Sequence, residues 1–128
     1  MKTLRILAIG AHPDDLEILC AWTLAKYAAQ GDHVTMAVAT NGEVGSPVLA
    51  KKEIAEIRRQ EALAAAAVIG ADLIWINHPD EFLFSNENTR LDFLNVVRQS
   101  RPTSFSLMVR PITIRTIEQP DKLHGISV

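Results

Sequence analysis

The sequence predicts a three-layer α/β fold with a mostly parallel sheet, and three observations support this prediction. Short apolar runs alternate along the chain with longer segments of helical periodicity. The connections are short, and the sequence holds no internal repeat, low-complexity tract or linker. The 128 residues, 48% of them hydrophobic, suffice for one domain with a real core and are few for two. We therefore predict a single α/β domain over residues 1–128.

The first three elements form a βαβ unit. Leu4–Ile9 is a short apolar run that predicts a strand, and Leu16–Gln30 carries apolar residues at helical spacing. Gly31 and Asp32 are typical of a helix end, and the alternating residues of His33–Ala39 predict a second strand. The short connection sends the chain back along the same sheet.

The alternation continues beyond a loop at residues 40–47. Ala50–Ile69 predicts a long, alanine-rich amphipathic helix that Gly70 stops. Leu73–Ile76 predicts a buried strand, and Thr89–Ser100 predicts another helix. The order of strands and helices therefore favours a parallel sheet covered on both faces.

Composition excludes several classes of partner. The net charge is −2 with both signs mixed along the chain, so we expect no nucleic-acid partner. The apolar run at residues 4–11 is too short to span a bilayer, so no membrane span is expected. The single cysteine, Cys20, excludes an internal disulfide and fits a cytoplasmic protein. Its place beside Leu19 and Leu24 is more typical of a core residue than of a nucleophile.

Three chemistry-bearing side chains follow the first predicted strand in "ILAIGAHPDDLE". In a parallel α/β sheet, ligands bind beyond the carboxyl ends of the strands, where His12, Asp14 and Asp15 are expected. One aspartate at a helix start has a purely structural explanation, because it caps free N–H groups. Two adjacent carboxylates repel, and a divalent metal would relieve that repulsion. A His and an Asp three residues apart across a turn can reach one zinc ion, with the other Asp as general base.

Several segments together carry a family resemblance. The stretches "AHPDDLE", "LAKYAAQGDHV", "VATNGEVGS" and "EIRRQEALAAAAVIGAD" resemble the zinc-dependent N-acetylglucosaminylphosphatidylinositol de-N-acetylases, or PIG-L family, and their bacterial LmbE-like relatives. The similarity covers roughly residues 3–102, which leaves a tail at residues 103–128 without it. The resemblance implies a Rossmann-like LmbE fold and a hydrolase that removes the acetyl group of an N-acetylglucosamine-containing substrate with metal-activated water.

The resemblance also implies roles for individual residues. His12 and Asp15 match the metal ligands, and Asp14 matches the base that activates water. Arg58 in "RRQE" and Asp80 in "HPDEF" match positions that contact sugar hydroxyls, although each also reads as an ordinary helix or turn residue. The implied cofactor is zinc, which mixed His and Asp ligation does not distinguish from iron. The implied partner is a small N-acetylated sugar conjugate.

The sequence departs from the family in two places. Relatives often carry glycines where this chain has Cys20, Ala21 and Trp22, so the packing behind the first helix should differ. The family takes its third zinc ligand from a later motif like D-Y-H-P-D-H-R, which this chain lacks. None of the three other histidines is expected to replace it, and these are His33, His78 and His124.

The tail offers an explanation for the missing motif. Back-translated in the neighbouring frame, residues 112–120 can encode D-Y-H-P-D-H-R-A-T. Our hypothesis is that one nucleotide was lost near the codons for Pro102 and Thr103, which would make this chain a frameshifted and truncated deacetylase. Ser104–Val109 still alternates well enough to predict a fourth strand. An exposed sheet edge and uncovered helix faces would favour self-association into a homo-oligomer.

Two function classes remain open from the sequence. The first is a zinc-dependent N-acetyl sugar deacetylase. The second is a catalytically inactive α/β fragment that lacks the third metal ligand and is at most a weak metal- or sugar-binding module. A nucleotide-binding Rossmann domain is disfavoured, because the first turn holds carboxylates where a glycine-rich phosphate loop is needed.

Overall fold

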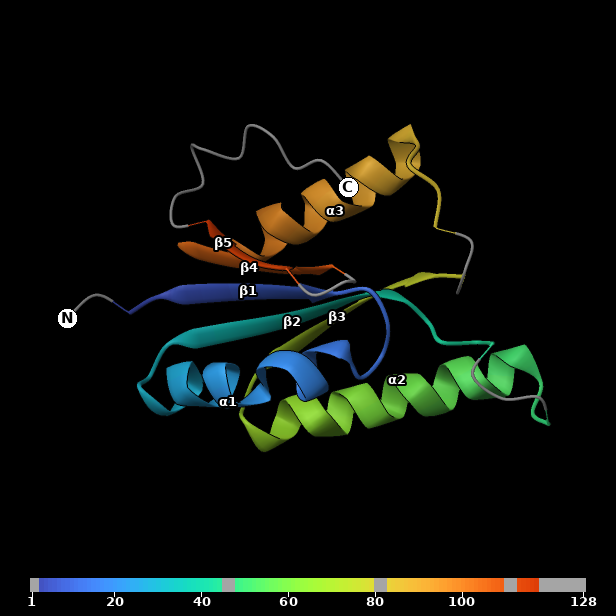
Figure 1. Cartoon of the computed structure of the whole chain (residues 1–128), viewed down its shortest axis with the longest axis horizontal. Coiled ribbons are helices and arrows are strands. Elements are labelled where there is room, and N and C mark those ends of the chain that lie inside the picture. The colour runs from blue at the N-terminus through green and yellow to red at the C-terminus, as the bar shows by residue number, and fades with distance from the viewer. Residues whose placement is uncertain (1–2, 45–47, 80–82, 110–112, 118–128) are drawn as a thin grey trace.

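The computed structural model describes residues 3–44, 48–79, 83–109 and 113–117, and of the two last strands it describes the backbone alone (Figure 1). In chain order the elements are β1 (Arg5–Gly10), α1 (Asp15–Ala29), β2 (His33–Thr40), α2 (Lys51–Val68), β3 (Asp72–His78), α3 (Glu87–Ser100), β4 (Ser104–Val109) and β5 (Thr113–Ile117).

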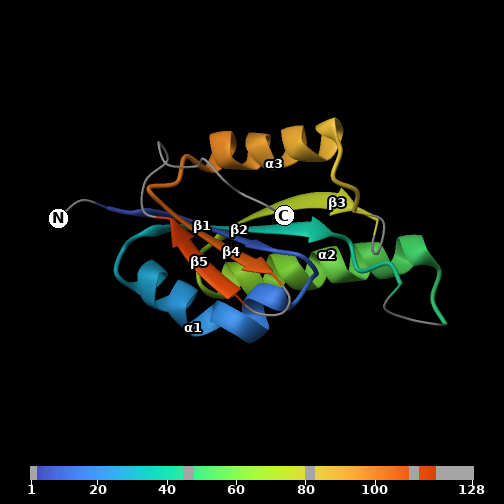
Figure 2. The same cartoon turned by 45° about the horizontal axis from the view of Figure 1, so that its top comes forward.

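The described strands form one sheet in the order β3-β2-β1-β4-β5. The pairs β1–β2, β2–β3 and β1–β4 are parallel, and β5 alone runs antiparallel, along β4. Helices α1 and α2 cover one face of this sheet and α3 covers the other (Figures 1 and 2). The predicted three-layer architecture with a mostly parallel sheet is therefore confirmed.

Each face of the sheet has its own apolar cluster. On the α1 and α2 side, Ile6 and Ala8 of β1 pack with Leu16 and Leu24. On the α3 side, Leu7 and Ile9 of β1 and Ala37 of β2 pack with Val96 of α3. Successive residues of a strand point to opposite faces, so a strand covered on both sides must be apolar throughout. This explains why β1 and β2 are almost entirely buried.

Two helices end at the glycines that predicted their ends, and α3 begins earlier than the predicted Thr89. Gly31 and Gly70 adopt φ values of +90° and +70° after α1 and α2, the left-handed conformation that glycine reaches without a steric cost. Asn86 starts α3, where its side chain accepts a hydrogen bond of 2.9 Å from the Thr89 N–H. One irregularity lies inside α1, where Cys20 is non-helical with φ −144°. The kink falls on the segment where glycines were expected from the family.

The fourth strand, predicted over Ser104–Val109, is confirmed as β4. The antiparallel β5 was not predicted.

A candidate metal and catalytic site after β1

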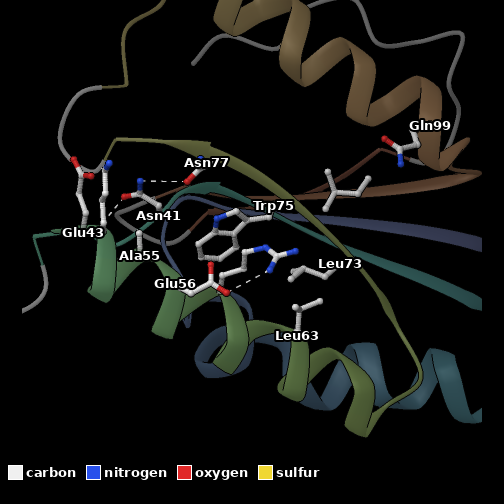
Figure 3. A pocket seen from close by; sticks show the side chains of 12 residues that line it. Asn41, Glu43, Ala55, Glu56, Leu63, Leu73, Trp75, Asn77 and Gln99 are labelled. Atoms are coloured by element: carbon white, nitrogen blue, oxygen red, sulfur yellow. Dashed lines mark hydrogen bonds and ion pairs between the residues drawn. The ribbon is translucent and has the colours of Figure 1, made fainter. Parts of the chain in front are cut away.

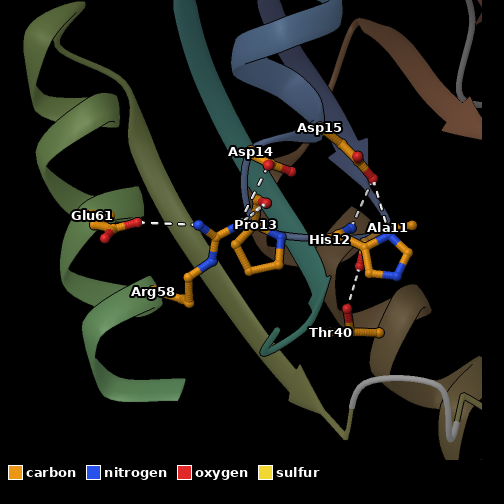
Figure 4. A network of polar contacts seen from close by, with 8 residues as sticks. All are labelled: Ala11, His12, Pro13, Asp14, Asp15, Thr40, Arg58 and Glu61. Atoms are coloured by element: carbon orange, nitrogen blue, oxygen red, sulfur yellow. Dashed lines mark hydrogen bonds and ion pairs between the residues drawn. The ribbon is translucent and has the colours of Figure 1, made fainter. Parts of the chain in front are cut away.

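The turn between β1 and α1 brings two predicted metal ligands together. Asp15 is the first residue of α1 and its side chain is buried, with 4% exposed. Its Oδ2 accepts a hydrogen bond of 2.9 Å from the backbone N–H of His12. The same oxygen lies 3.4 Å from Nδ1 of His12, whose ring is 43% exposed. The two donors therefore converge at the carboxyl end of β1, with the imidazole open to solvent (Figure 4).

The predicted base, Asp14, sits in a strained backbone conformation. Its φ is +95°, which a residue with a Cβ adopts at a cost of about 1–3 kcal/mol. Its carboxylate is 48% exposed and makes no capping hydrogen bond to the helix. The capping explanation is therefore wrong for Asp14, because the left-handed turn swings its side chain away from the helix N–H groups.

Arg58 of α2 secures this turn from the side (Figure 4). Its Nη2 donates a 2.8 Å hydrogen bond to the carbonyl of Pro13 and lies 3.4 Å from Oδ2 of Asp14. Its Nη1 lies 3.3 Å from Glu61, one turn further along α2. The guanidinium thus holds the backbone before Asp14 and the Asp14 carboxylate at once, which compensates for the strain of that residue.

The end of β2 supports the same turn. The sequence did not predict this support. Thr40 donates to the carbonyl of Ala11 through both its backbone N–H, at 2.9 Å, and its hydroxyl, at 2.7 Å. The next residue, Asn41, is buried, and its side-chain oxygen accepts a 3.1 Å bond from the N–H of Glu43. The available signal was the polar pair Thr40-Asn41 at the exit of a buried apolar strand. Glu43 therefore belongs to a loop ordered by Asn41.

The other described histidines are engaged elsewhere. Nε2 of His33 lies 2.9 Å from Asp72, at the opposite end of the sheet from His12. Nε2 of His78 lies 2.9 Å from Asp92 of α3. His124 and Asp80 lie outside the described residues. Among the residues that the structure describes, no group of three or more His, Cys, Asp or Glu side chains could hold a metal ion.

Cys20 packs against the cluster beneath α1 as a partly buried side chain. Burial raises the pKa of its thiol from 9.0 to about 11, with a smaller contribution from the charge of Glu17. A thiol with a raised pKa is protonated at neutral pH and is a poor nucleophile and ligand. This agrees with the prediction of a core residue.

A family model described as "PIG-L: GlcNAc-PI de-N-acetylase" matches residues 7–120. The chain belongs to the PIG-L family. The matched span includes residues 103–120 of the tail, and a division of the chain after Pro102 stays a prediction.

Individual relatives agree with this family. The chain is 35% identical over 88 residues to mycothiol S-conjugate amidase of Streptomyces coelicolor, which covers 62% of this chain and 30% of the relative. It is 30% identical over 109 residues to the uncharacterized deacetylase YaiS of Escherichia coli. This alignment covers 84% of this chain and 56% of the relative. The chain therefore spans about a third to a half of the length of these relatives.

A solved structure shows the same fold. N,N'-diacetylchitobiose deacetylase from Pyrococcus horikoshii superposes with a TM-score of 0.73 at 30% identity, over 78% of this chain and 39% of that one. In the described part of this chain, no helix is both long and apolar enough to cross a membrane.

Proposed function

We propose that this chain carries the metal-binding turn and the general base of an N-acetyl sugar deacetylase. The observation that supports it is the convergence of His12 Nδ1 and Asp15 Oδ2 within 3.4 Å, beside Asp14, in a PIG-L family chain. Relatives named as deacetylases, including one named for N,N'-diacetylchitobiose, suggest an N-acetylated sugar conjugate as substrate. A cytoplasmic location, drawn from the single cysteine, belongs to the same proposal.

The two donors of this turn, His12 and Asp15, fit a divalent metal. His12 and Asp15 offer one imidazole nitrogen and one carboxylate oxygen from a single turn, a combination that zinc accepts. Such an ion would supply Lewis acidity, polarising the acetyl carbonyl and lowering the pKa of water. The proposal of zinc instead of iron rests on the family resemblance, because His and Asp ligands suit both metals.

Asp14 would handle the protons of the reaction. Water oxygen bonds to the acetyl carbonyl carbon and the C–N bond breaks, which releases acetate and a free amine. Asp14 accepts a proton from the attacking water and returns it to the departing nitrogen. Its half-exposed carboxylate can reach a substrate, and the contact with Arg58 fixes its direction. General acid–base catalysis of this kind contributes about 10²–10⁴-fold to a rate.

Arg58 and Asp80 remain proposed sugar contacts. Arg58 already donates to Pro13 and faces Asp14, so one guanidinium would position the base and, with its remaining N–H groups, bind a sugar hydroxyl. For Asp80 the support is its match to the family position.

We further propose that the missing third ligand is encoded in the neighbouring reading frame of the tail. Residues 112–120 permit the D-Y-H-P-D-H-R-A-T sequence in that frame, and the described part of the chain offers no third donor near His12 and Asp15. Sequencing the gene and its transcript around the codons for Pro102 and Thr103 tests this. A restored frame that continues with family similarity is expected, and a second frame without it would refute the proposal.

The second candidate function is an inactive metal- or sugar-binding module. The absence of a three-donor cluster among the described residues favours it, because a two-ligand site should hold zinc weakly.

The deciding experiment measures zinc content and acetate release from N-acetylglucosamine derivatives, for this chain and for a chain with the frame restored. Activity in the restored chain alone, lost in Asp14→Asn, would show that this polypeptide retains only part of a deacetylase site. Activity in both, lost in Asp14→Asn, would show that His12 and Asp15 suffice. Full activity of Asp14→Asn in the restored chain would refute the assigned base.

A further inference from the structure

The outer edge of β3 has no strand beside it in the described part of the chain. β3 pairs with β2 on one side and stands first in the sheet order. Unlike the strongly buried β1 and β2, its residues are half-buried or exposed. An open edge presents unpaired backbone N–H and C=O groups, which bind another strand readily.

A groove of about 610 Å³ follows this edge (Figure 3). Its floor is the edge of β3, and one side is a stripe of α2 at helical spacing. The residues that matter here are Leu73, Ile74 and Trp75 of β3 and Glu56, Arg59 and Leu63 of α2. The groove thus joins a bare strand edge to an apolar and charged helix face.

We propose that this groove is the interface of a homodimer, in which β3 of one copy pairs antiparallel with β3 of a second copy. The two-fold axis passes through Trp75, and the two five-stranded sheets become one continuous sheet. Two identical strands that pair about a two-fold axis must be antiparallel, so each residue faces a fixed counterpart.

The side chains of β3 are self-complementary in this register. Ile74 of one copy faces Ile76 of the other, and Trp75 faces its own counterpart. Ile74 and Ile76 pack on the α3 side of the sheet, and Leu73 packs on the α1 and α2 side, so Trp75 lies on the latter by alternation. In the same register Leu73 faces Asn77 of the other copy, so the apolar contacts across the axis are those of Ile74 with Ile76 on the α3 side and of Trp75 with its counterpart on the other side. Such apolar cross-strand pairs stabilise a sheet.

The charges on α2 are also self-complementary. Oε1 of Glu56 lies 3.6 Å from Nη1 of Arg59, and both side chains are partly exposed. Glu56 lies below Trp75 in Figure 3, close to the proposed axis. A two-fold axis perpendicular to the line from Glu56 to Arg59 places the acid of each copy opposite the base of the other. The interface would therefore carry two crossed ion pairs, which favour a second copy over an unrelated partner.

Sedimentation velocity of the full chain tests the dimer at concentrations up to about 100 µM, where a weak interface is still populated. We expect a dimer, and Trp75→Glu should dissociate it because two carboxylates then face each other on the axis. Glu56→Arg and Arg59→Glu should each weaken association about tenfold through like charges. The double exchange Glu56→Arg with Arg59→Glu should restore it, because the opposite charges face each other again.

A matched control comes from the other described tryptophan. Trp22 on α1 is 91% exposed and lies away from the groove, so Trp22→Glu should leave the dimer intact. Circular dichroism checks that each variant is folded. A monomeric parent chain would overturn the proposal. So would a dimer that folded Trp75→Glu retains, or a double exchange that fails to recover association. A dimer lost in Trp22→Glu and kept in Trp75→Glu would place the interface on α1 and also overturn it.

Discussion

The sequence His-Pro-Asp occurs at the carboxyl ends of both β1 and β3, yet the two histidines are held in different ways. His12 lies against Asp15, three residues later on the same turn, and its ring is 43% exposed. His78 lies against Asp92, which α3 supplies from the other face of the sheet, and its ring is 19% exposed. The first histidine therefore keeps close to half of its ring exposed, beside a buried carboxylate of the same turn. A carboxylate from another helix ties the second into the structure.

The largest difference between the two loops should be in zinc affinity. We expect His12→Ala and Asp15→Ala each to lower the affinity for Zn²⁺ about 100-fold or more, because each removes one of two convergent donors. His78→Ala is the matched control and should leave the affinity unchanged. Isothermal titration with Zn²⁺ measures all three. An equal loss in His78→Ala would mean that the second loop binds the metal as well.

A smaller effect should appear in the support of the first loop. Gly42 and Gly70 have φ values of +69° and +70°, so an alanine at either suffers similar backbone strain, about 1 kcal/mol. At Gly42 the new Cβ would also lie 3.1 Å from Cγ of Pro13, whereas at Gly70 nothing lies within 4 Å. We expect Gly42→Ala to lower the free energy of unfolding by about 1–3 kcal/mol more than Gly70→Ala. Urea titration compares them, and equal losses would show that the loop yields easily.

The smallest effect concerns the thiol behind the first loop. The pKa of Cys20 is about 11 in the folded chain and 9.0 without the fold, so the folded state binds more protons between these values. Stability from this group is therefore present below pH 9 and is lost as the pH rises toward 11. We expect iodoacetamide to alkylate the folded chain at pH 8 more slowly than the urea-unfolded chain. Equal rates would indicate an exposed, ordinary thiol.

Most of the fold was predictable because periodicity reports burial directly. Apolar runs and helical spacing located seven elements within a few residues of their observed ends, including β4. The antiparallel β5 escaped because its pairing with β4 is a tertiary choice that no local pattern expresses. For the segment around Cys20 the sequence predicted altered packing and no kink. Residues that replace expected glycines do not show by themselves how the helix adjusts.

The site was predictable where its residues lie close in sequence. His12, Asp14 and Asp15 share one turn, so spacing alone brought them together. Arg58 also contacts this turn, but it lies 45 positions along the chain from Pro13, the residue to which it donates a hydrogen bond. Its contacts with Pro13 and Asp14 arise only because α2 packs beside the loop. The buried support from Thr40 and Asn41 escaped for the same reason.

The most direct test of the central claim is a crystal structure of the protein soaked in zinc, with anomalous scattering recorded at the zinc edge. Three His–Asp pairs compete for the ion in the described part of the chain, namely His12–Asp15, His33–Asp72 and His78–Asp92. Our account predicts the strongest peak between Nδ1 of His12 and the carboxylate of Asp15. A strongest peak at either of the other pairs, with none in the turn after β1, would contradict it.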